Sequence, residues 1–229
     1  TMELGSNSGV IVMDDGDWEL AARKVSAAGY ALAGQVCISV QRVYVHDSHF
    51  EAFVKLLKSL VTALKVGNQL EEDTDVGPMI SEAEAIVKAG WIEEAVAGGA
   101  KLVCGGGRER ALLEPAILTN VDPRAKVSCK EVFAPVVCVS PIGSLEEGIE
   151  RLNDSDYGLQ GAIFTRRLKD AMTAARRVEV GGFMINEVPT FRADLMPYGG
   201  VKKSGLGREG ARYAIEEMTE IRLVCMDLR

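Results

Sequence analysis

Residues 42–64, RVYVHDSHFEAFVKLLKSLVTAL, contain the pattern that decides the fold of this chain. The first five residues are rich in β-branched and aromatic side chains, and they predict a strand over 42–46. Apolar residues then recur every three or four positions, which is typical of an amphipathic helix over 50–64, with Asp47 or Ser48 as its N-cap. A strand followed by a turn and a helix is the repeating unit of an α/β protein.

The same alternation continues on both sides of this unit. We expect helices over 18–31 with Asp17 as N-cap, from Ser81 to about 97 with Glu84 completing a capping box, and over 145–152, 168–178 and 211–217. We expect strands over 4–13, 101–104, 116–118, 136–139, 160–164 and 182–185, and a last one over 221–226. Alternating strands and helices predict a three-layer α/β/α fold with a mainly parallel sheet. The last strand has no partner nearby in the sequence, so it predicts pairing with another domain or subunit, as an oligomerisation strand does.

Composition excludes several classes of protein. The chain has 229 residues, of which 47% are hydrophobic and 26% charged, so it is expected to be soluble and globular. No apolar run approaches the roughly 18 to 20 residues that cross a bilayer, so we expect no membrane anchor. The net charge is −7, and 26 Lys and Arg residues lie scattered among 33 acidic ones, which argues against a nucleic-acid partner.

Five cysteines form an odd number without Cys-x-x-Cys spacing. This count favours neither a disulfide framework nor a zinc site, and a reducing cytoplasm is the expected compartment. The chain begins with Thr1, and the apolar run over 4–13 follows with no turn or cap before it. We therefore expect the chain to be a piece of a longer protein.

Two motifs that suggest chemistry lack the context that they need. Residues 205–210 match G-x-G-x-x-G, but no strand precedes them and no βαβ unit surrounds them, so we interpret them as a structured loop. His46 and His49 flank Asp47 at the start of a predicted helix. No third ligand is suitably spaced, so we predict no metal site, and we expect these histidines to cap the helix rather than to pair with a thiol.

The cysteines differ in their sequence surroundings, which control thiol reactivity. Cys37 follows Gly34 and precedes Ser39 at a transition from helix to turn, so small neighbours leave room for a substrate. A nucleophilic Cys37 and a merely packed Cys37 both remain open on these residues alone. Cys138 and Cys225 lie in apolar strand patterns, where we expect buried and inert thiols.

Two carboxylates stand apart from the solvated acidic loops. Glu3 is an isolated acid in an apolar stretch, where burial would raise its pKa toward that of a general base. Glu131 and Phe133 are separated by one residue in a short segment that ends in proline, and an extended backbone would point both side chains to the same side. A structural role for either carboxylate is the alternative.

Taken together, four motifs in this order and spacing resemble the signatures of the NAD(P)-dependent aldehyde dehydrogenase superfamily. The motifs are Glu3-Leu4-Gly5, Gly34-Gln35-Val36-Cys37, Glu131-Val132-Phe133-Ala134-Pro135, and PYGGVKKSGLGRE over 197–209. The resemblance covers essentially the whole chain and corresponds to the C-terminal, catalytic half of a family member. Ala134 and Ser6 stand where the family often has glycine, which leaves the backbone less free at both positions.

The resemblance implies a role for four of these residues. Cys37 is the nucleophile, Glu3 the general base, Glu131 the carboxylate that holds the nicotinamide ribose, and Phe133 the aromatic side chain beside that part of the cofactor. The implied reaction oxidises an aldehyde to a carboxylic acid with NAD or NADP through a cysteine thiohemiacetal and a thioester. The rest of the cofactor site belongs to the family's N-terminal half, so we expect the chain to be inactive by itself.

The resemblance also implies a domain organisation. Residues 1–8 correspond to a remnant of the cofactor-binding domain that carries the general base. Residues 9–208 correspond to the catalytic domain, and residues 209–229 to a C-terminal helix and oligomerisation strand. A homo-oligomer is therefore expected for the full-length protein.

Substrate class is suggested by residues 186–192, NEVPTFR, which are similar to members that act on small oxygenated or anionic aldehydes such as lactaldehyde. Arg192 could pair with a carboxylate or phosphonate, and an exposed loop arginine is the alternative. A relative that transfers the acyl group to coenzyme A remains open, although hydrolysis needs a base and Glu3 supplies one. A noncatalytic oligomerisation module also remains open.

Overall fold

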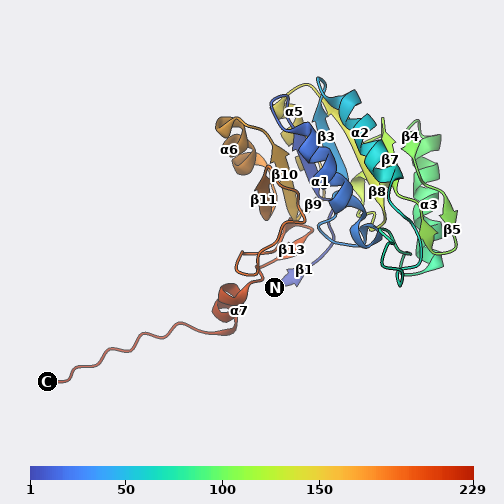
Figure 1. The fold of residues 1–229 in the computed structure, drawn as a ribbon. Coiled ribbons are helices and arrows are strands. Elements are labelled where there is room, and N and C mark those ends of the chain that lie inside the picture. The colour runs from blue at the N-terminus through green and yellow to red at the C-terminus, as the bar shows by residue number, and fades with distance from the viewer.

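The computed structural model describes residues 1–229 and shows a seven-stranded sheet between two layers of helices (Figure 1). In spatial order, the strands are β11 (Gly182–Ile185), β10 (Gln160–Phe164), β2 (Gly9–Val12), β3 (Arg42–His46), β8 (Val136–Ile142), β7 (Ala116–Thr119) and β4 (Lys101–Cys104). All neighbouring strands run parallel except β4, which pairs antiparallel with β7 at one edge. The predicted α/β/α fold with a mainly parallel sheet is confirmed.

Helices lie on both faces of this sheet. They are α1 (Trp18–Tyr30), α2 (Phe50–Thr62), α3 (Glu82–Ala97), α4 (Lys126–Cys129), α5 (Leu145–Asn153), α6 (Leu168–Arg177) and α7 (Ala211–Met218). Helices α1 and α2 pack against each other on one face, and α5 and α6 cover the other. Side chains of β2 alternate accordingly, because Val10 and Val12 join the larger core cluster and Ile11 joins the smaller one. None of the helices is both long and apolar enough to cross a membrane.

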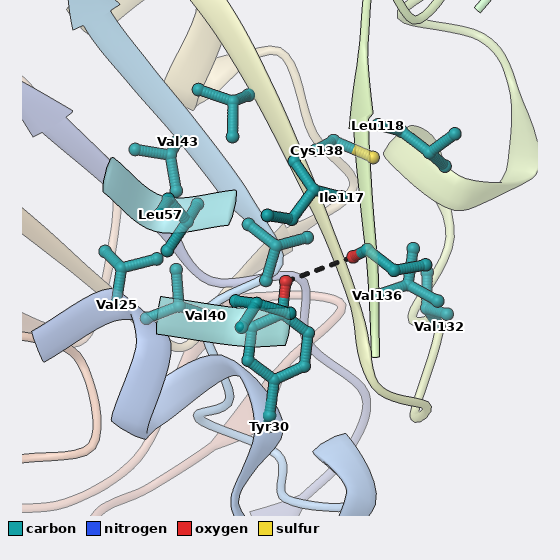
Figure 2. Packing of buried hydrophobic residues seen from close by; sticks show 14 of the residues in the cluster. Val25, Tyr30, Val40, Val43, Leu57, Ile117, Leu118, Val132, Val136 and Cys138 are labelled. Atoms are coloured by element: carbon teal, nitrogen blue, oxygen red, sulfur yellow. Dashed lines mark hydrogen bonds between the residues drawn. The ribbon is translucent and has the colours of Figure 1, made fainter. Parts of the chain in front are cut away.

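Tyr30 ties the end of α1 to the sheet within the larger core cluster (Figure 2). Its ring is fully buried, and its hydroxyl donates a hydrogen bond to the carbonyl oxygen of Ala116 in β7 at 3.1 Å. Burial raises the pKa of this phenol well above its ordinary value, so the hydroxyl stays protonated and can donate. The end of α1 is therefore held in place just before the segment that contains Cys37.

The N-caps show where local sequence determines the helix ends. The Asp17 side chain accepts a hydrogen bond from the Leu20 N–H, and the Ser81 side chain accepts one from the Glu84 N–H, so both predicted N-caps form. The Glu84 carboxylate pairs with Lys88 and does not complete the predicted capping box. The predicted cap of α2 at Asp47 or Ser48 is wrong. The helix begins at Phe50, and His49, at the N-cap position, makes no side-chain cap either. The Ser48 hydroxyl does not cap the helix because it is hydrogen-bonded to His46 Nδ1.

The predicted strand over 4–13 is too long at its start, since β2, over 9–12, is the only strand within that range. A short strand β1 (Met2–Glu3) pairs antiparallel with β13 (Gly205–Leu206), and only β2 enters the main sheet. Between β1 and β2, Leu4 is exposed, and Ser6, Asn7 and Ser8 are buried. The Ser6 N–H donates to Glu131, the Asn7 amide donates to the Ser128 carbonyl oxygen in α4, and the Ser8 carbonyl oxygen accepts from the Arg42 N–H at the start of β3. Two further short pairs were not predicted: β5 (Arg108–Glu109) with β6 (Leu112–Leu113), and β9 (Tyr157–Gly158) with β12 (Val201–Lys202).

The C-terminal residues extend away from the fold beyond α7 (Figure 1). Residues 221–226 form no strand within this chain, since no strand lies beside them to complete a hydrogen-bonded ladder. Cys225 in this stretch is exposed, so the expectation of a buried thiol at Cys225 is wrong, whereas Cys138 is buried as expected. Pairing of this stretch with another subunit stays a prediction.

Two loops cross in very close contact next to the sheet. A 3₁₀ turn, η1 (Ala31–Gly34), presses Gly34 against the backbone of Ala134, so that a Cβ atom added to Gly34 would lie 2.1 Å from the Ala134 carbonyl oxygen. Gly34 also has a φ of +69°, in the left-handed region that favours glycine. The crossing therefore depends on the absence of a side chain at this position.

We expect Gly34→Ala to destabilise the fold by more than about 2 kcal/mol, because it adds left-handed strain to a clash with backbone that cannot rotate away. The matched control is Gly90→Ala in the exposed middle of α3, where an added Cβ meets no atom within 4 Å. That control should stabilise the protein by about 0.5–1 kcal/mol through helix propensity. Urea unfolding followed by circular dichroism measures both changes, and equal stability of Gly34→Ala and the parent chain would contradict the analysis.

Candidate active site

Three of the residues singled out in the sequence, Cys37, Glu131 and Phe133, lie where neighbouring parallel strands begin, whereas Glu3 and Arg192 do not line the cleft found there. Ser6 precedes β2, Cys37 precedes β3 and Glu131 precedes β8, and these strands are neighbours in the sheet. Because parallel strands start at the same edge, the three segments meet there. A narrow cleft of about 10 Å³ at this edge is lined by Cys37 together with Glu131 and Phe133.

Cys37 follows a strained turn. Leu32 and Ala33 both have left-handed backbones, with φ of +51° and +56°, although neither is glycine. Such strain costs about 1–2 kcal/mol per residue and persists only where the surroundings impose it, as the buried end of α1 and the Gly34 crossing do here. The turn leaves the Cys37 side chain half-buried, with Sγ 3.1 Å from the hydroxyl oxygen of Tyr198.

Glu131 is held by a single backbone group. Its Oε1 accepts a hydrogen bond from the Ser6 N–H at 2.9 Å, whereas Oε2 accepts none from the chain. Burial raises the pKa of Glu131, and the Ser6 hydrogen bond and the charge of Lys88 oppose that rise. The carboxylate therefore keeps one acceptor oxygen that no hydrogen bond within the chain uses.

Gln41 anchors the loop that carries Glu131, and the sequence analysis did not identify it. Its buried amide donates to the carbonyl oxygens of Val127 at 3.1 Å and Lys130 at 2.6 Å, and its Oε1 accepts from the Val132 N–H at 3.1 Å. A glutamine at the start of a strand gives no warning in the sequence that it will satisfy three backbone groups of a distant loop. This amide fixes the loop relative to β3.

Phe133 lies at the border between the cleft and a second, more open hollow of about 800 Å³. Its φ is +51°, so the extended backbone that we expected over 131–133 is wrong, because the loop must turn sharply at the Gly34 crossing. The phenyl ring is 42% exposed. A free carboxylate oxygen on Glu131 and an exposed ring on Phe133 fit a cofactor that combines sugar hydroxyls with an aromatic group.

Glu3 projects from the short strand β1. Its Oε1 is buried and has no hydrogen-bond partner in the chain. Burial raises the pKa of Glu3, the nearby charge of Glu209 raises it further, and Arg192 and Arg208 lower it. A buried oxygen without a donor and a raised pKa together suit a carboxylate that takes a proton from water.

Arg192 and Tyr198 complete the surroundings of Cys37. The Arg192 guanidinium lies over the Tyr198 ring, 4.2 Å from its centroid, and donates to Glu209 Oε2 at 3.1 Å. Arg192 is half-exposed. This exposure is compatible with the expected contact to a substrate and equally with the alternative, an exposed loop arginine. Tyr198 belongs to a quoted motif, but nothing in its sequence context indicated a contact with sulfur.

The structure keeps two other motifs away from this cleft. His46 is the last residue of β3 and Cys37 precedes its first, so they lie at opposite ends of the strand. His49 is hydrogen-bonded to the Asp14 carbonyl oxygen and stacks on Trp18, which is a local structural role. Residues 205–206 pair antiparallel with β1, so the G-x-G-x-x-G match lies in a structured loop, as interpreted.

Curated relatives are similar to this sequence along nearly all of its length. A 3-sulfolactaldehyde dehydrogenase of Priestia aryabhattai is 51% identical over 228 residues, which is 100% of this chain and 48% of the relative. A lactaldehyde dehydrogenase of Methanococcus maripaludis is 43% identical over 224 residues, which is 98% of this chain and 48% of the relative. The chain thus spans about half the length of the curated relatives that it matches.

Solved structures of proteins similar in sequence to this chain have the same fold. A glyceraldehyde-3-phosphate dehydrogenase of Methanocaldococcus jannaschii, complexed with NADP, superposes with a TM-score of 0.93 at 42% identity, covering 96% of this chain and 48% of the other. An aldehyde dehydrogenase of Physcomitrella patens, in complex with the reaction product succinate, gives 0.91 at 41% identity, covering 96% and 46%. A sequence model of the aldehyde dehydrogenase family matches residues 1–224, and the chain belongs to that family.

Proposed function

We propose that this chain is the catalytic half of an enzyme that oxidises an aldehyde to a carboxylic acid with NAD or NADP. The observation that carries the proposal is the cleft that Cys37 shares with Glu131 and Phe133. A nucleophile and a cofactor-holding carboxylate must face one space if a covalent adduct is to be oxidised there. Family membership supports the same reaction.

The proposed chemistry begins at Cys37. Its thiolate adds to the aldehyde carbon, and the Cys37 N–H, which no other group of the chain uses, is available to the developing oxyanion. NAD(P), when bound, would supply the hydride acceptor that oxidation of the resulting thiohemiacetal to a thioester requires. Glu131 would hold the ribose hydroxyls and Phe133 would pack beside the nicotinamide end. Glu3 then takes a proton from water, which attacks the thioester, and the C–S bond breaks to release the acid and the thiolate.

Hydrolysis, rather than transfer of the acyl group to coenzyme A, is favoured by Glu3. A thiol acceptor needs no base at this position, whereas water does. The unpartnered, buried Oε1 of Glu3 is costly to maintain unless a water molecule or reacting group uses it. We therefore propose that the acyl group leaves as a carboxylate.

For the substrate we propose a small oxygenated or anionic aldehyde, recognised in part by Arg192. Two similar proteins act, by their names, on 3-sulfolactaldehyde and lactaldehyde, which are small and hydroxylated. The Arg192 guanidinium carries five N–H donors, and only one hydrogen bond, to Glu209, is formed within the chain. The remaining donors lie beside Tyr198, whose hydroxyl contacts Cys37.

We further propose the domain organisation 1–8, 9–208 and 209–229, with a homo-oligomer formed through the last segment. Its support is that β1 leaves the main sheet and that Ile221 and Leu223 are almost fully exposed beyond α7. Apolar side chains on an extended segment are suited to pairing with another subunit. A reducing, cytoplasmic location is proposed from five cysteines that form no disulfide.

Cys37→Ser should abolish the rapid acylation of the chain by p-nitrophenyl acetate. In that reaction the thiolate attacks the ester carbon and p-nitrophenolate leaves, so the burst at 400 nm measures the nucleophile without any cofactor. Cys225→Ser, which removes an exposed thiol far from the cleft, is the control and should keep the burst. A burst that survives Cys37→Ser would end the proposal.

Glu3→Gln should leave the burst intact but lower the steady-state release that follows it by at least about a hundredfold, because deacylation loses its base. The base acts when deprotonated, and the Glu3 pKa is raised, so steady-state turnover of the parent chain should climb with pH above the usual range of a glutamate. The Gln variant should lack this rising limb. Superimposable pH profiles for the two proteins would exclude Glu3 as the base.

Arg192→Gln should reduce the preference for an anionic acyl group. We expect the burst rate with the mono-p-nitrophenyl ester of succinate, divided by that with p-nitrophenyl acetate, to fall about tenfold, since a charge-assisted hydrogen bond is lost. Arg212→Gln on α7, where the arginine pairs with Glu216 instead, should leave the ratio unaltered. An unchanged ratio for Arg192→Gln would assign Arg192 to the loop alone.

A further inference from the structure

We infer that Tyr198 is a positioning residue for Cys37, with its hydroxyl donating a hydrogen bond to the thiolate sulfur. The inference rests on the proposed function only in naming Cys37 as the nucleophile. The contact itself is a property of this chain, because the two atoms lie 3.1 Å apart and both residues belong to it. Such a distance is short for a hydrogen bond to sulfur, whose radius exceeds that of oxygen.

The phenol is well shielded from water. Tyr198 is only 3% exposed and packs with Ile38 and Leu159 in a small apolar cluster, to which Val36 and Cys37 also belong. On the side of the phenol, the contact with the sulfur is therefore surrounded by apolar side chains. In such surroundings a single O–H donor has a larger effect on a charged acceptor than it has in solvent.

The backbone and ring of Tyr198 are fixed from two sides. Its N–H donates to the Glu209 carbonyl oxygen at 3.1 Å, and its own carbonyl oxygen accepts from the Glu209 N–H at 2.6 Å. Arg192 covers the ring at 4.2 Å and is itself tied to the Glu209 side chain. The hydroxyl is therefore presented to Cys37 by a rigid assembly, which is what positioning a nucleophile requires.

The direction of the hydrogen bond follows from proton counting. Burial, followed by the hydrogen bond and charge of Cys37 and the charge of Glu3, raises the pKa of Tyr198, and Arg192 only partly opposes this rise. The phenol therefore keeps its proton near neutral pH. A thiolate has no proton to give, so the hydroxyl donates and stabilises the charged sulfur.

Tyr198→Phe tests the inference because it removes one oxygen and keeps the ring. The readout is the rate at which iodoacetamide alkylates Cys37, followed by peptide mass spectrometry across pH in a Cys225→Ser background. We expect the midpoint of the pH profile to move to higher pH and the rate at pH 7 to fall at least about tenfold, the size expected for losing a hydrogen bond to a charged group. At high pH, where Cys37 is fully ionised in the Tyr198→Phe variant and in the parent chain alike, the alkylation rates of the two proteins should converge. A general structural defect would not produce this convergence.

Tyr213→Phe on α7 is the matched control and should leave the Cys37 profile unaltered. If Tyr198→Phe fails to fold, a fluorinated tyrosine at position 198 keeps ring and hydroxyl but is a stronger donor, and it should move the midpoint to lower pH. A midpoint that neither substitution moves would overturn the inference.

The two proposals fail separately. Loss of the tyrosine effect with an intact, Cys37-dependent acylation burst would leave the proposed function standing. A clear tyrosine effect without any burst would instead retain the hydrogen bond and remove the catalytic role of Cys37.

Discussion

The contact between Gly34 and the Ala134 carbonyl is the constraint on which the site depends. It brings two loops, one before β3 and one before β8, closer together than any side chain would allow. The cost is left-handed backbone at Leu32, Ala33 and Phe133, which the rigid sheet and the buried end of α1 sustain. The crossing holds the loop before Cys37 against the loop that carries Glu131 and Phe133.

The location of the site departs from the general rule for parallel sheets. Ligands usually bind beyond the carboxyl ends of the strands, yet here the cleft lies where β2, β3 and β8 begin. Buried polar side chains make this edge ordered: Gln41 satisfies three backbone groups, and the Arg42 guanidinium donates to the carbonyl oxygens of Asn7, Arg151 and Leu152. All of these acceptors are uncharged oxygens, so hydrogen bonds rather than ion pairs hold this edge of the sheet.

The regular part of the fold could be predicted from the sequence because periodicity and caps act locally. The strand over 42–46 and the caps at Asp17 and Ser81 agree with the structure. The site could be predicted less well from the sequence, because Gln41 and Tyr198 contact groups that lie 91 and 161 positions away along the chain. No local pattern encodes such pairings, and the sharp turn at Phe133 likewise results from a tertiary contact rather than from its neighbours.

Glu3, Cys37, Glu131 and Tyr198 come from both ends and the middle of the chain. A nascent or partly unfolded chain therefore carries the Cys37 thiol without the Tyr198 hydroxyl and the Glu131 carboxylate that the folded chain places near it. The surroundings of this sulfur are complete only after a segment 161 positions further along the chain has been made and has folded.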